Sequence, residues 1–376
     1  MKKLKVMTIL GTRPEIIRLS ETIKACDRYF DHVLVHTGQN WDPHLNDVFF
    51  QELELKQPDY FLNCAGENLG ETMGSILAKT YDVMLKEKPD AVLVLGDTNS
   101  ALSAICAKRL KTPIFHMEAG NRCWDWNVSE MINRRIVDAI SDINLPYTEN
   151  SRRYLLSEGV DGKTVFVTGS PMREVLEKHM AQIDASDVLD QLHLEKGNYI
   201  LVSAHREENI DIEENFLSLM NAINAIAEKY QMPVIYSTHP RSMKFIQKRS
   251  FKFHPLVRNL EPFGFFEYNH LQKNAFCVLS DSGTLSEESA ILGFNGILIR
   301  TSTERPEALD AGSVTIGGIT QESIEQAMEL NASLFANHEP IGCARDYQDT
   351  NVSIKVVRII QSYTDIVNRT TWLKKE

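Results

Sequence analysis

The chain has 376 residues, of which 43% are hydrophobic and 24% are charged, and its formal net charge is -11. This composition is ordinary for a globular protein, and the length suits two domains because single cores stop growing at roughly 250–300 residues. The negative charge argues against a general nucleic-acid or membrane-surface binder, which would carry a basic stripe, so we expect neither partner.

The cysteines and the amino-terminal segment both point to a cytoplasmic protein. The six cysteines form no CxxC pair and have no short Cys/His spacing, which predicts reduced thiols and no zinc site. The first apolar run covers only residues 6–10 and has no small-residue cleavage site after it, so a buried strand fits better than a signal peptide. No apolar stretch reaches the roughly 18 residues that a membrane-spanning helix needs.

Apolar runs alternate with longer amphipathic segments, and this pattern repeats in the second half. It predicts an α/β fold with two Rossmann-like lobes that have parallel sheets and face a cleft. The predicted N-terminal lobe is 1–170, the C-terminal lobe is 171–354, and a closing helix at about 355–376 packs back on the first lobe. Predicted strands are 5–10, 32–36, 91–95, 113–117 and 143–146, then 199–203, 233–237, 256–259, 277–280, 296–300 and 314–316. Predicted helices include 15–26, 70–87, 100–109, 214–229 and about 352–367.

Three acidic residues lie where such a sheet places its catalytic and ligand-binding side chains. Asp97 and Glu118 each follow an apolar run that is typical of a buried parallel strand, and Glu130 comes shortly after. The carboxyl ends of parallel strands line the ligand crevice of open α/β sheets. A bare carboxylate there costs free energy unless a cation, a proton or a substrate compensates it. Acid/base chemistry therefore explains this placement better than packing does.

The turn after the first strand reads Gly-Thr-Arg-Pro-Glu and includes Arg13. A glycine turn at a helix start with a nearby arginine suits a phosphate or diphosphate, although an ordinary strand-to-helix turn explains it equally well. The dinucleotide fingerprint GxGxxG and the phosphate loop GxxxxGK[ST] are both missing, which argues against a dehydrogenase or a P-loop ATPase.

A second candidate anion cradle is Asp-Ser-Gly-Thr, which follows the strand at 277–280 and contains Ser282 and Gly283. Its small hydroxyls and backbone N–H groups at a helix start suit a diphosphate. The motif alone is explained more simply as a helix N-cap.

Two histidines follow strands and have an arginine close by. They are His205, in Ser-Ala-His-Arg-Glu-Glu-Asn, and His239, in Thr-His-Pro-Arg. A single histidine in such a place is more often structural, but two of them favour contact with a phosphate or a leaving group. Glu304 can accept from ribose hydroxyls or form a surface ion pair with Arg305. Tyr268 can stack on a base, although its aromatic run is more typical of a core.

Taken together, these motifs resemble the non-hydrolysing UDP-N-acetylglucosamine 2-epimerases of bacteria, and they occur in order through nearly the whole chain. The resemblance implies a glycosyltransferase-B architecture, no metal or other cofactor, a UDP-sugar substrate and a homodimer. The motifs are GTRPE, HTGQN, LGDTNS, HMEAGNR, SAHREEN, THPR, SDSGTLSEE and TSTERPEAL.

The segment after Glu118 resembles one branch of this family, the UDP-2-acetamido-2,6-dideoxy-β-L-talose 2-epimerases. These enzymes make UDP-N-acetyl-L-fucosamine for capsule and O-antigen. Asn121-Arg122-Cys123 replaces the Leu-Arg-Thr-Gly-Asp of the glucosamine branch, and Arg18 replaces its usual Lys. The family's Pro-Glu-Glu is Ser129-Glu130-Met131 here, which keeps the first Glu and loses a charge.

The resemblance implies elimination of UDP to a 2-acetamidoglycal, followed by protonation on the opposite face of C2 and re-addition of UDP. Our hypothesis assigns the proton transfers at C2 to Glu118 and Asp97, with Glu130 supporting them or supplying the other face. His205 binds or protonates the departing diphosphate. The expected substrate-binding residues are Arg13, Arg18, Gln39, Arg122, His239, Tyr268, Ser282, Gly283 and Glu304.

Four alternatives remain open on the sequence alone. They are a UDP-N-acetylglucosamine 2-epimerase, a glycosyltransferase with the same two lobes, a hydrolysing epimerase, and a catalytically weak regulator that binds nucleotide sugars.

Overall fold

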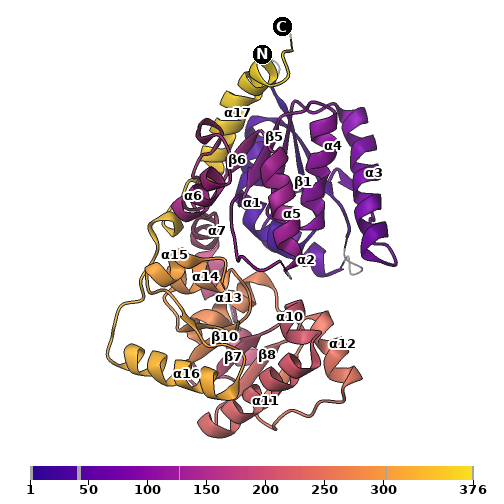
Figure 1. The fold of residues 1–376 in the computed structure, drawn as a ribbon. Helices are drawn as coiled ribbons and strands as arrows, with labels where there is room; N and C mark the ends of the chain where they lie inside the picture. The colour runs from indigo at the N-terminus through magenta and orange to yellow at the C-terminus, as the bar shows by residue number, and fades with distance from the viewer. Residues whose placement is uncertain (1–2, 40–43, 127, 301–302, 375–376) are drawn as a thin grey trace. The chain divides into compact units, whose positions relative to one another are not determined.

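The computed structural model describes residues 3–39, 44–126, 128–300 and 303–374. Its contacts divide the chain into two units, Met1–Glu177 with Gln348–Glu376, and Lys178–Tyr347. The predicted domain boundaries, after residues 170 and 354, lie near these divisions. Figure 1 shows the elements of each unit.

The first unit is built on a six-stranded parallel sheet with the order β3-β2-β1-β4-β5-β6. The central strands are almost wholly buried, as expected when helices cover both faces of a parallel sheet. The strand order reverses between β1 and β4, and ligands of such sheets bind at the carboxyl ends beside this switch point. The strands are β1 Lys5–Leu10, β2 Asp31–His36, β3 Tyr60–Phe61, β4 Ala91–Leu95, β5 Ile114–Met117 and β6 Ile143–Leu145.

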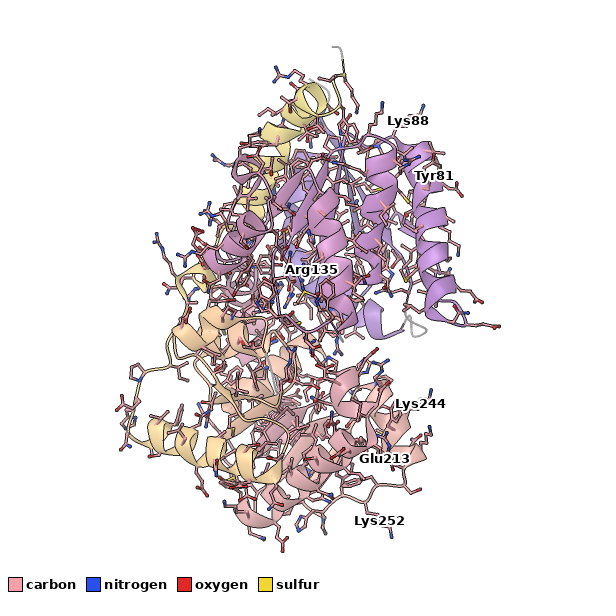
Figure 2. All side chains as sticks on the ribbon, viewed as in Figure 1. Tyr81, Lys88, Arg135, Glu213, Lys244 and Lys252 are labelled. Carbon is pink, nitrogen blue, oxygen red and sulfur yellow. The ribbon has the colours of Figure 1, made fainter. Side chains whose placement is uncertain are left out.

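The helices of this unit begin and end at residues with suitable local chemistry. Pro14 lies in the first turn of α1, where its missing N–H costs nothing. Asn68 caps α3 by accepting from the backbone N–H of Glu71, and α3 ends at the left-handed Lys88 (Figure 2). The closing helix α17 packs on α1. The helices are α1 Arg13–Tyr29, α2 His44–Glu52, α3 Leu69–Glu87, η1 Asn99–Ser103, α4 Ala104–Arg109, α5 Ser129–Ile140, α6 Glu149–Ser157, η2 Gly162–Thr164, α7 Met172–Lys178 and α17 Val352–Thr370.

The second unit repeats this topology with the sheet order β12-β11-β10-β7-β8-β9, also parallel throughout. Its switch point lies between β7 and β10. The loops that carry His205 and Ser282 leave these two strands, so they meet at that crevice. The strands are β7 Ile200–Ser203, β8 Val234–Ser237, β9 Val257–Leu260, β10 Cys277–Ser280, β11 Gly296–Leu298 and β12 Thr315–Ile316.

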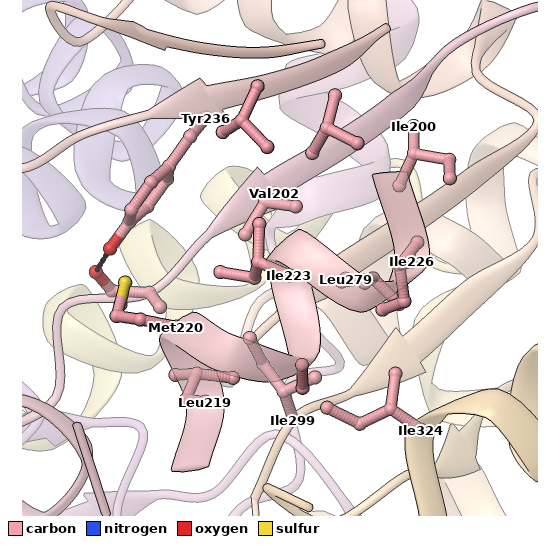
Figure 3. Packing of buried hydrophobic residues seen from close by; sticks show 14 of the residues in the cluster. Ile200, Val202, Leu219, Met220, Ile223, Ile226, Tyr236, Leu279, Ile299 and Ile324 are labelled. Atoms are coloured by element: carbon pink, nitrogen blue, oxygen red, sulfur yellow. Dashed lines mark hydrogen bonds between the residues drawn. The ribbon is translucent and has the colours of Figure 1, made fainter. Parts of the chain in front are cut away.

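A buried aliphatic cluster holds the helices of the second unit on its sheet. Val202 of β7 and Leu279 of β10 pack with Ile223 of α11 (Figure 3). The Tyr236 hydroxyl donates to the Ala204 carbonyl at 3.0 Å, which satisfies a polar group inside this core. The helices are α8 Met180–Asp184, α9 Val188–Gln191, α10 Glu207–Ile210, α11 Glu213–Tyr230, α12 Pro240–Lys248, α13 Phe265–Asn274, α14 Leu285–Leu292, α15 Pro306–Asp310, α16 Gln321–Ala336 and η3 Arg345–Tyr347.

The predicted α/β fold with two parallel Rossmann-like sheets is confirmed. The predicted helix at 100–109 is interrupted, because its first part is the 3₁₀ segment η1 and only Ala104–Arg109 is α-helical. In the described part of the chain, no helix combines the length and the apolar character that crossing a bilayer requires.

Candidate active site

The first unit brings the two predicted proton-transfer carboxylates to one guanidinium. Asp97 follows β4 and Glu118 follows β5, at the carboxyl edge of the sheet. Nη2 of Arg134, on α5, pairs with Asp97 Oδ2 and lies 3.6 Å from Glu118 Oε1. Nη1 of Arg134 also donates to the Glu118 backbone carbonyl. A single arginine thus links the loops after β4 and β5.

A second arginine compensates the buried charge of Glu118. Arg18 lies on α1, and its Nη1 pairs with Glu118 Oε2. Glu118 and Arg134 are only 3% and 2% exposed, so an unpaired carboxylate here would be costly. The two positive charges favour the ionised carboxylate, which is the form that can accept a proton from carbon.

Glu118 also has an unusual backbone conformation. Its φ angle is 60°, in the left-handed region that residues other than glycine seldom adopt. Such conformations persist where the surroundings enforce them, and they cluster at functional sites. A Cβ on Gly96 would lie 3.5 Å from Glu118 Oε2, so the turn before Asp97 borders this carboxylate closely.

Glu130 lies in the first turn of α5, on the helix that carries Arg134. Glu130, Arg134 and Asp138 are spaced by four residues, which places them on one face of the helix. Met131 is buried, so an apolar side chain fills the position where the family usually has its second Glu. The helix keeps the predicted Glu130 in the region that holds the other two carboxylates.

The turn after β1 is occupied by the protein's own carboxylate. Glu15 Oε2 accepts from the Gly11 N–H at 3.0 Å and from the Thr12 hydroxyl at 2.8 Å. Glu15 Oε1 accepts from the Thr98 hydroxyl at 3.0 Å, which ties this turn to the Asp97 loop. Burial raises the pKa of Glu15 to about 7, despite these hydrogen bonds. The role of this turn as a phosphate cradle stays a prediction, and Glu15 competes with it for the Gly11 N–H.

Of three further predicted binding residues of this unit, Arg13 and Arg122 have structural contacts of their own. The Arg13 guanidinium lies 5.5 Å from the centre of the Phe49 ring. Arg122 is 1% exposed, and its Nη2 lies 2.8 Å from Asp138 Oδ2 and 2.6 Å from Glu158 Oε2. Gln39 follows β2, and no described residue donates to its buried Oε1, which leaves an acceptor suited to a ligand hydroxyl. The structure gives Arg122 a structural role, and its substrate contact stays a prediction.

In the second unit, Asp281 ties the two switch-point loops together. It is fully buried, and its Oδ2 accepts from the backbone N–H groups of His205 and Arg206, each at 2.9 Å. His205 Nδ1 lies 3.3 Å from Asp281 Oδ1, and the His205 ring centre is 5.4 Å from that of His239. The two predicted histidines are therefore neighbours. His239 Nδ1 accepts from the Arg241 N–H, so this nitrogen carries no proton.

Glu304 lies beside guanidinium groups of the same unit. Its Oε1 is 3.3 Å from Arg206 Nη2 and 4.0 Å from Arg300 Nη1. Arg305 is buried and lies 3.4 Å from Glu287, so it is not a surface cation. Burial, together with the charge of Arg206, lowers the pKa of Arg300. A guanidinium that is buried beside a second positive charge is stabilised by a bound anion such as a diphosphate.

Ser282 and Gly283 form the turn between β10 and α14. The Ser282 hydroxyl lies 2.9 Å from that of Thr284, and its N–H donates to Ser280 Oγ at 3.1 Å. A Cβ on Gly283 would lie 3.1 Å from Glu304 Oε1, so glycine lets Glu304 approach this turn. Tyr268 lies on α13 and packs against the core of the second unit. This contact agrees with the core interpretation of its aromatic run, and base stacking stays a prediction.

Sequence reasoning missed Arg134, Asp138, Glu15 and Asp281. The spacing of four from Glu130 to Arg134 and Asp138 was a usable signal, because it marks one face of a predicted helix. Glu15 and Asp281 were visible as motif letters, but only the fold shows that each bridges two loops. Among the described residues, no three His, Cys, Asp or Glu side chains are grouped as a metal site requires.

Comparison with known proteins finds one family across most of the chain. Residues 24–361 match the family described as UDP-N-acetylglucosamine 2-epimerase. The structure named UDP-N-acetylglucosamine 2-epimerase from Rickettsia bellii is 45% identical, with a TM-score of 0.91, over 99% of this chain and all of that one.

Two further relatives differ in the sugars that their names give. The Methanocaldococcus jannaschii UDP-GlcNAc 2-epimerase, solved with UDP-GlcNAc and UDP, is 34% identical over 96% of this chain and 100% of that one, with a TM-score of 0.89. The UDP-2,3-diacetamido-2,3-dideoxy-D-glucuronate 2-epimerase of Pseudomonas aeruginosa is 33% identical over 86% of this chain and 91% of its own length.

Proposed function

Because the chain belongs to the UDP-N-acetylglucosamine 2-epimerase family and is thus an isomerase of UDP-sugars, we propose that it inverts C2 of UDP-2-acetamido-2,6-dideoxy-β-L-talose. The product is UDP-N-acetyl-L-fucosamine. The observation that carries the proposed chemistry is the pair of carboxylates, Asp97 and Glu118, that share Arg134 at the carboxyl edge of the first sheet.

The reaction needs a proton removed from C2 and a proton returned to its other face. The C1–O bond to UDP breaks as the C2–H proton leaves, and the C1=C2 bond of a 2-acetamidoglycal forms. Protonation of the opposite face of C2 and return of the UDP oxygen to C1 complete the inversion. Asp97 and Glu118 carry these protons, and Glu130 supports them from α5.

The second unit binds the leaving group in this proposal. Ser282 and the neighbouring His205 contact the diphosphate, whose charge compensates the buried Arg300. Glu304 accepts from ribose hydroxyls. UDP is a good leaving group when its charge is stabilised in this way, so these residues lower the barrier to C1–O cleavage.

The choice of sugar rests on the segment between Glu118 and Glu130. Asn121, Arg122 and Cys123 replace the residues that are usual in the glucosamine branch, and this replacement is typical of the branch that makes UDP-N-acetyl-L-fucosamine. The relatives support a family in which the sugar varies, since one acts by name on a diacetamido glucuronate.

A second candidate function is the epimerisation of UDP-N-acetylglucosamine. The Rickettsia bellii protein carries that name and is 45% identical to this chain. The two candidates share the same chemistry at C2, so only a comparison of substrates separates them.

The test is to incubate the purified protein with each UDP-sugar separately and to resolve the products by chromatography. We expect the talose-configured sugar to yield its C2 epimer reversibly, without net release of UDP, and with kcat/KM at least tenfold above that of UDP-N-acetylglucosamine. A preference for UDP-N-acetylglucosamine would establish the second candidate. Irreversible release of UDP from both sugars would contradict both candidates.

We also propose that the protein is a homodimer that buries helices of the first unit. A groove of about 390 Å³ between α3 and α4 is lined by apolar side chains that include Leu77, Tyr81 and Ile105. Leu85 on α3 and Ile132 on α5 are 48% and 46% exposed. Figure 2 labels Tyr81 on α3. Light scattering should give twice the monomer mass, and Tyr81→Glu should shift the protein toward monomer.

A cytoplasmic location remains a prediction from the cysteines and the amino-terminal segment, and a role in capsular or O-antigen polysaccharide synthesis remains a prediction from the resemblance.

A further inference from the structure

A histidine outside the predicted site forms a hydrogen bond with the loop that carries Asp97. His116 lies within β5 and is fully buried. Its Nε2 lies 2.7 Å from the backbone carbonyl of Gly96, the residue before Asp97. A carbonyl oxygen can only accept, so Nε2 carries a proton and donates it to this bond.

The other ring nitrogen of His116 faces α5. Its Nδ1 lies 3.0 Å from Asp138 Oδ1, a close contact that lacks hydrogen-bond geometry. Both Asp138 oxygens lie 3.2 Å from the N–H of Gly120, two residues after Glu118. Burial alone would raise the pKa of Asp138, but the neighbouring His116, Arg122 and Arg134 hold it below its ordinary value. Asp138 is therefore a buried carboxylate that anchors the loop after β5.

The two anchored glycines, and Glu118 between them, all have positive φ angles. Gly96 and Gly120 have φ angles of 69° and 82°, and Glu118 between these two turns has 60°. One His–Asp pair thus contacts the chain just before Asp97 and just after Glu118. Asp138 also belongs to α5, on the same helix face as Glu130 and Arg134. The pair connects all three elements that carry the proposed acid/base groups.

We infer that His116 and Asp138 are positioning residues that set the separation of Asp97 and Glu118 for the proton transfers. This inference rests on the proposed function. The Gly96 carbonyl is the critical contact, because a shift of this turn moves Asp97 and also changes the space beside the Glu118 carboxylate. A misplacement of about 1 Å at reacting groups can lower a rate by roughly 10²-fold.

The experiment compares two amide substitutions of His116. In His116→Gln the amide nitrogen reaches the position of Nε2 and keeps the donor to Gly96. In His116→Asn it reaches only the position of Nδ1, which keeps the Asp138 side and loses Gly96. Each variant is assayed for kcat and KM by exchange of the C2 proton with solvent, beside its UDP affinity and its thermal unfolding midpoint. Val83→Ala, in the core of α3, controls for destabilisation of the same unit.

We expect His116→Gln to keep kcat within about fivefold and His116→Asn to lose about 10²-fold or more, with KM and UDP affinity within about threefold in both. Val83→Ala should lower the unfolding midpoint and leave kcat unchanged. Equal losses in the two His116 variants, or losses that only follow the unfolding midpoint, would overturn the inference.

Asp138→Asn keeps the side-chain shape and the His116–Gly96 bond but weakens the hold on Gly120. It should lower kcat about tenfold at constant KM, and an unchanged kcat would also overturn the inference, even if a His116 variant does not fold. A wild-type protein that exchanges the C2 proton of neither UDP-sugar would instead refute the proposed function, and the inference with it. If the wild type is active and the His116 and Asp138 variants keep its kcat, only the positioning role of this pair is refuted.

Discussion

Replacement of Glu15 by Gln should make the folding stability less sensitive to rising pH. Compared with wild type, the free energy of unfolding of the variant should become larger as the pH rises. Glu15 is 1% exposed, and burial raises its pKa from 4.5 to about 7. The unfolded chain therefore loses this proton at lower pH than the folded protein does, and folding stability falls as pH rises from 4.5 to 7. One pKa unit corresponds to about 1.4 kcal/mol, so the loss amounts to about 3 kcal/mol. Glutamine stays neutral and escapes this loss.

The measurement is the free energy of unfolding of the first unit by urea, for wild type and Glu15→Gln, at pH 4.5 and pH 8. The difference between the two proteins should move by about 3 kcal/mol in favour of Glu15→Gln over this range. Glu71→Gln is the matched control, because Glu71 also lies in the first turn of its helix and accepts from the N–H four residues before it, but is exposed. A pH-independent difference for Glu15→Gln, or an equal change for Glu71→Gln, would refute the reasoning.

Three other substitutions test separate parts of the site. Arg134→Met leaves Asp97 and Glu118 without their shared cation and should cost about 3–5 kcal/mol of stability and nearly all activity. Urea unfolding and C2 proton exchange measure the two effects, and a wild-type kcat would contradict this prediction. Gly11→Ala places a Cβ 2.0 Å from Thr37 Oγ1 and should lower the folding stability by about 1–3 kcal/mol in thermal melts. Gly74→Ala, whose Cβ would have nothing within 4 Å, should be neutral or stabilising in the same measurement. Gly283→Ala places a Cβ 3.1 Å from Glu304 Oε1 and should weaken UDP binding about tenfold by calorimetry; unchanged affinity would separate Glu304 from the nucleotide.

The sequence predicted those parts of the molecule that local patterns determine. Apolar runs such as Ala91–Leu95 are long enough to mark buried parallel strands, and the residue after each run is then at the carboxyl edge. This reasoning found Asp97 and Glu118 without any contact information. It found the neighbouring loops of His205 and Ser282 in the same way.

Partners that come from other elements could not be predicted. Arg134 reaches Asp97 across 37 positions of the sequence, and Arg18 reaches Glu118 across 100. Such pairs depend on how α1 and α5 pack beside the ends of β4 and β5, and this packing was not part of the prediction. The short strand β3 was missed because Tyr60–Phe61 is too brief for a period to show. The Gly-Thr-Arg-Pro-Glu motif was interpreted by its arginine, whereas its buried glutamate forms the contacts that join the loops.

The most direct test of the central claim is proton NMR in D₂O with UDP-2-acetamido-2,6-dideoxy-β-L-talose, beside UDP-N-acetylglucosamine. The account predicts loss of the C2 proton signal as the epimer forms, with UDP retained in the product, and no such exchange by Asp97→Asn or Glu118→Gln. Epimerisation that keeps the C2 proton, or exchange at a normal rate in both variants, would contradict elimination and re-addition through these carboxylates.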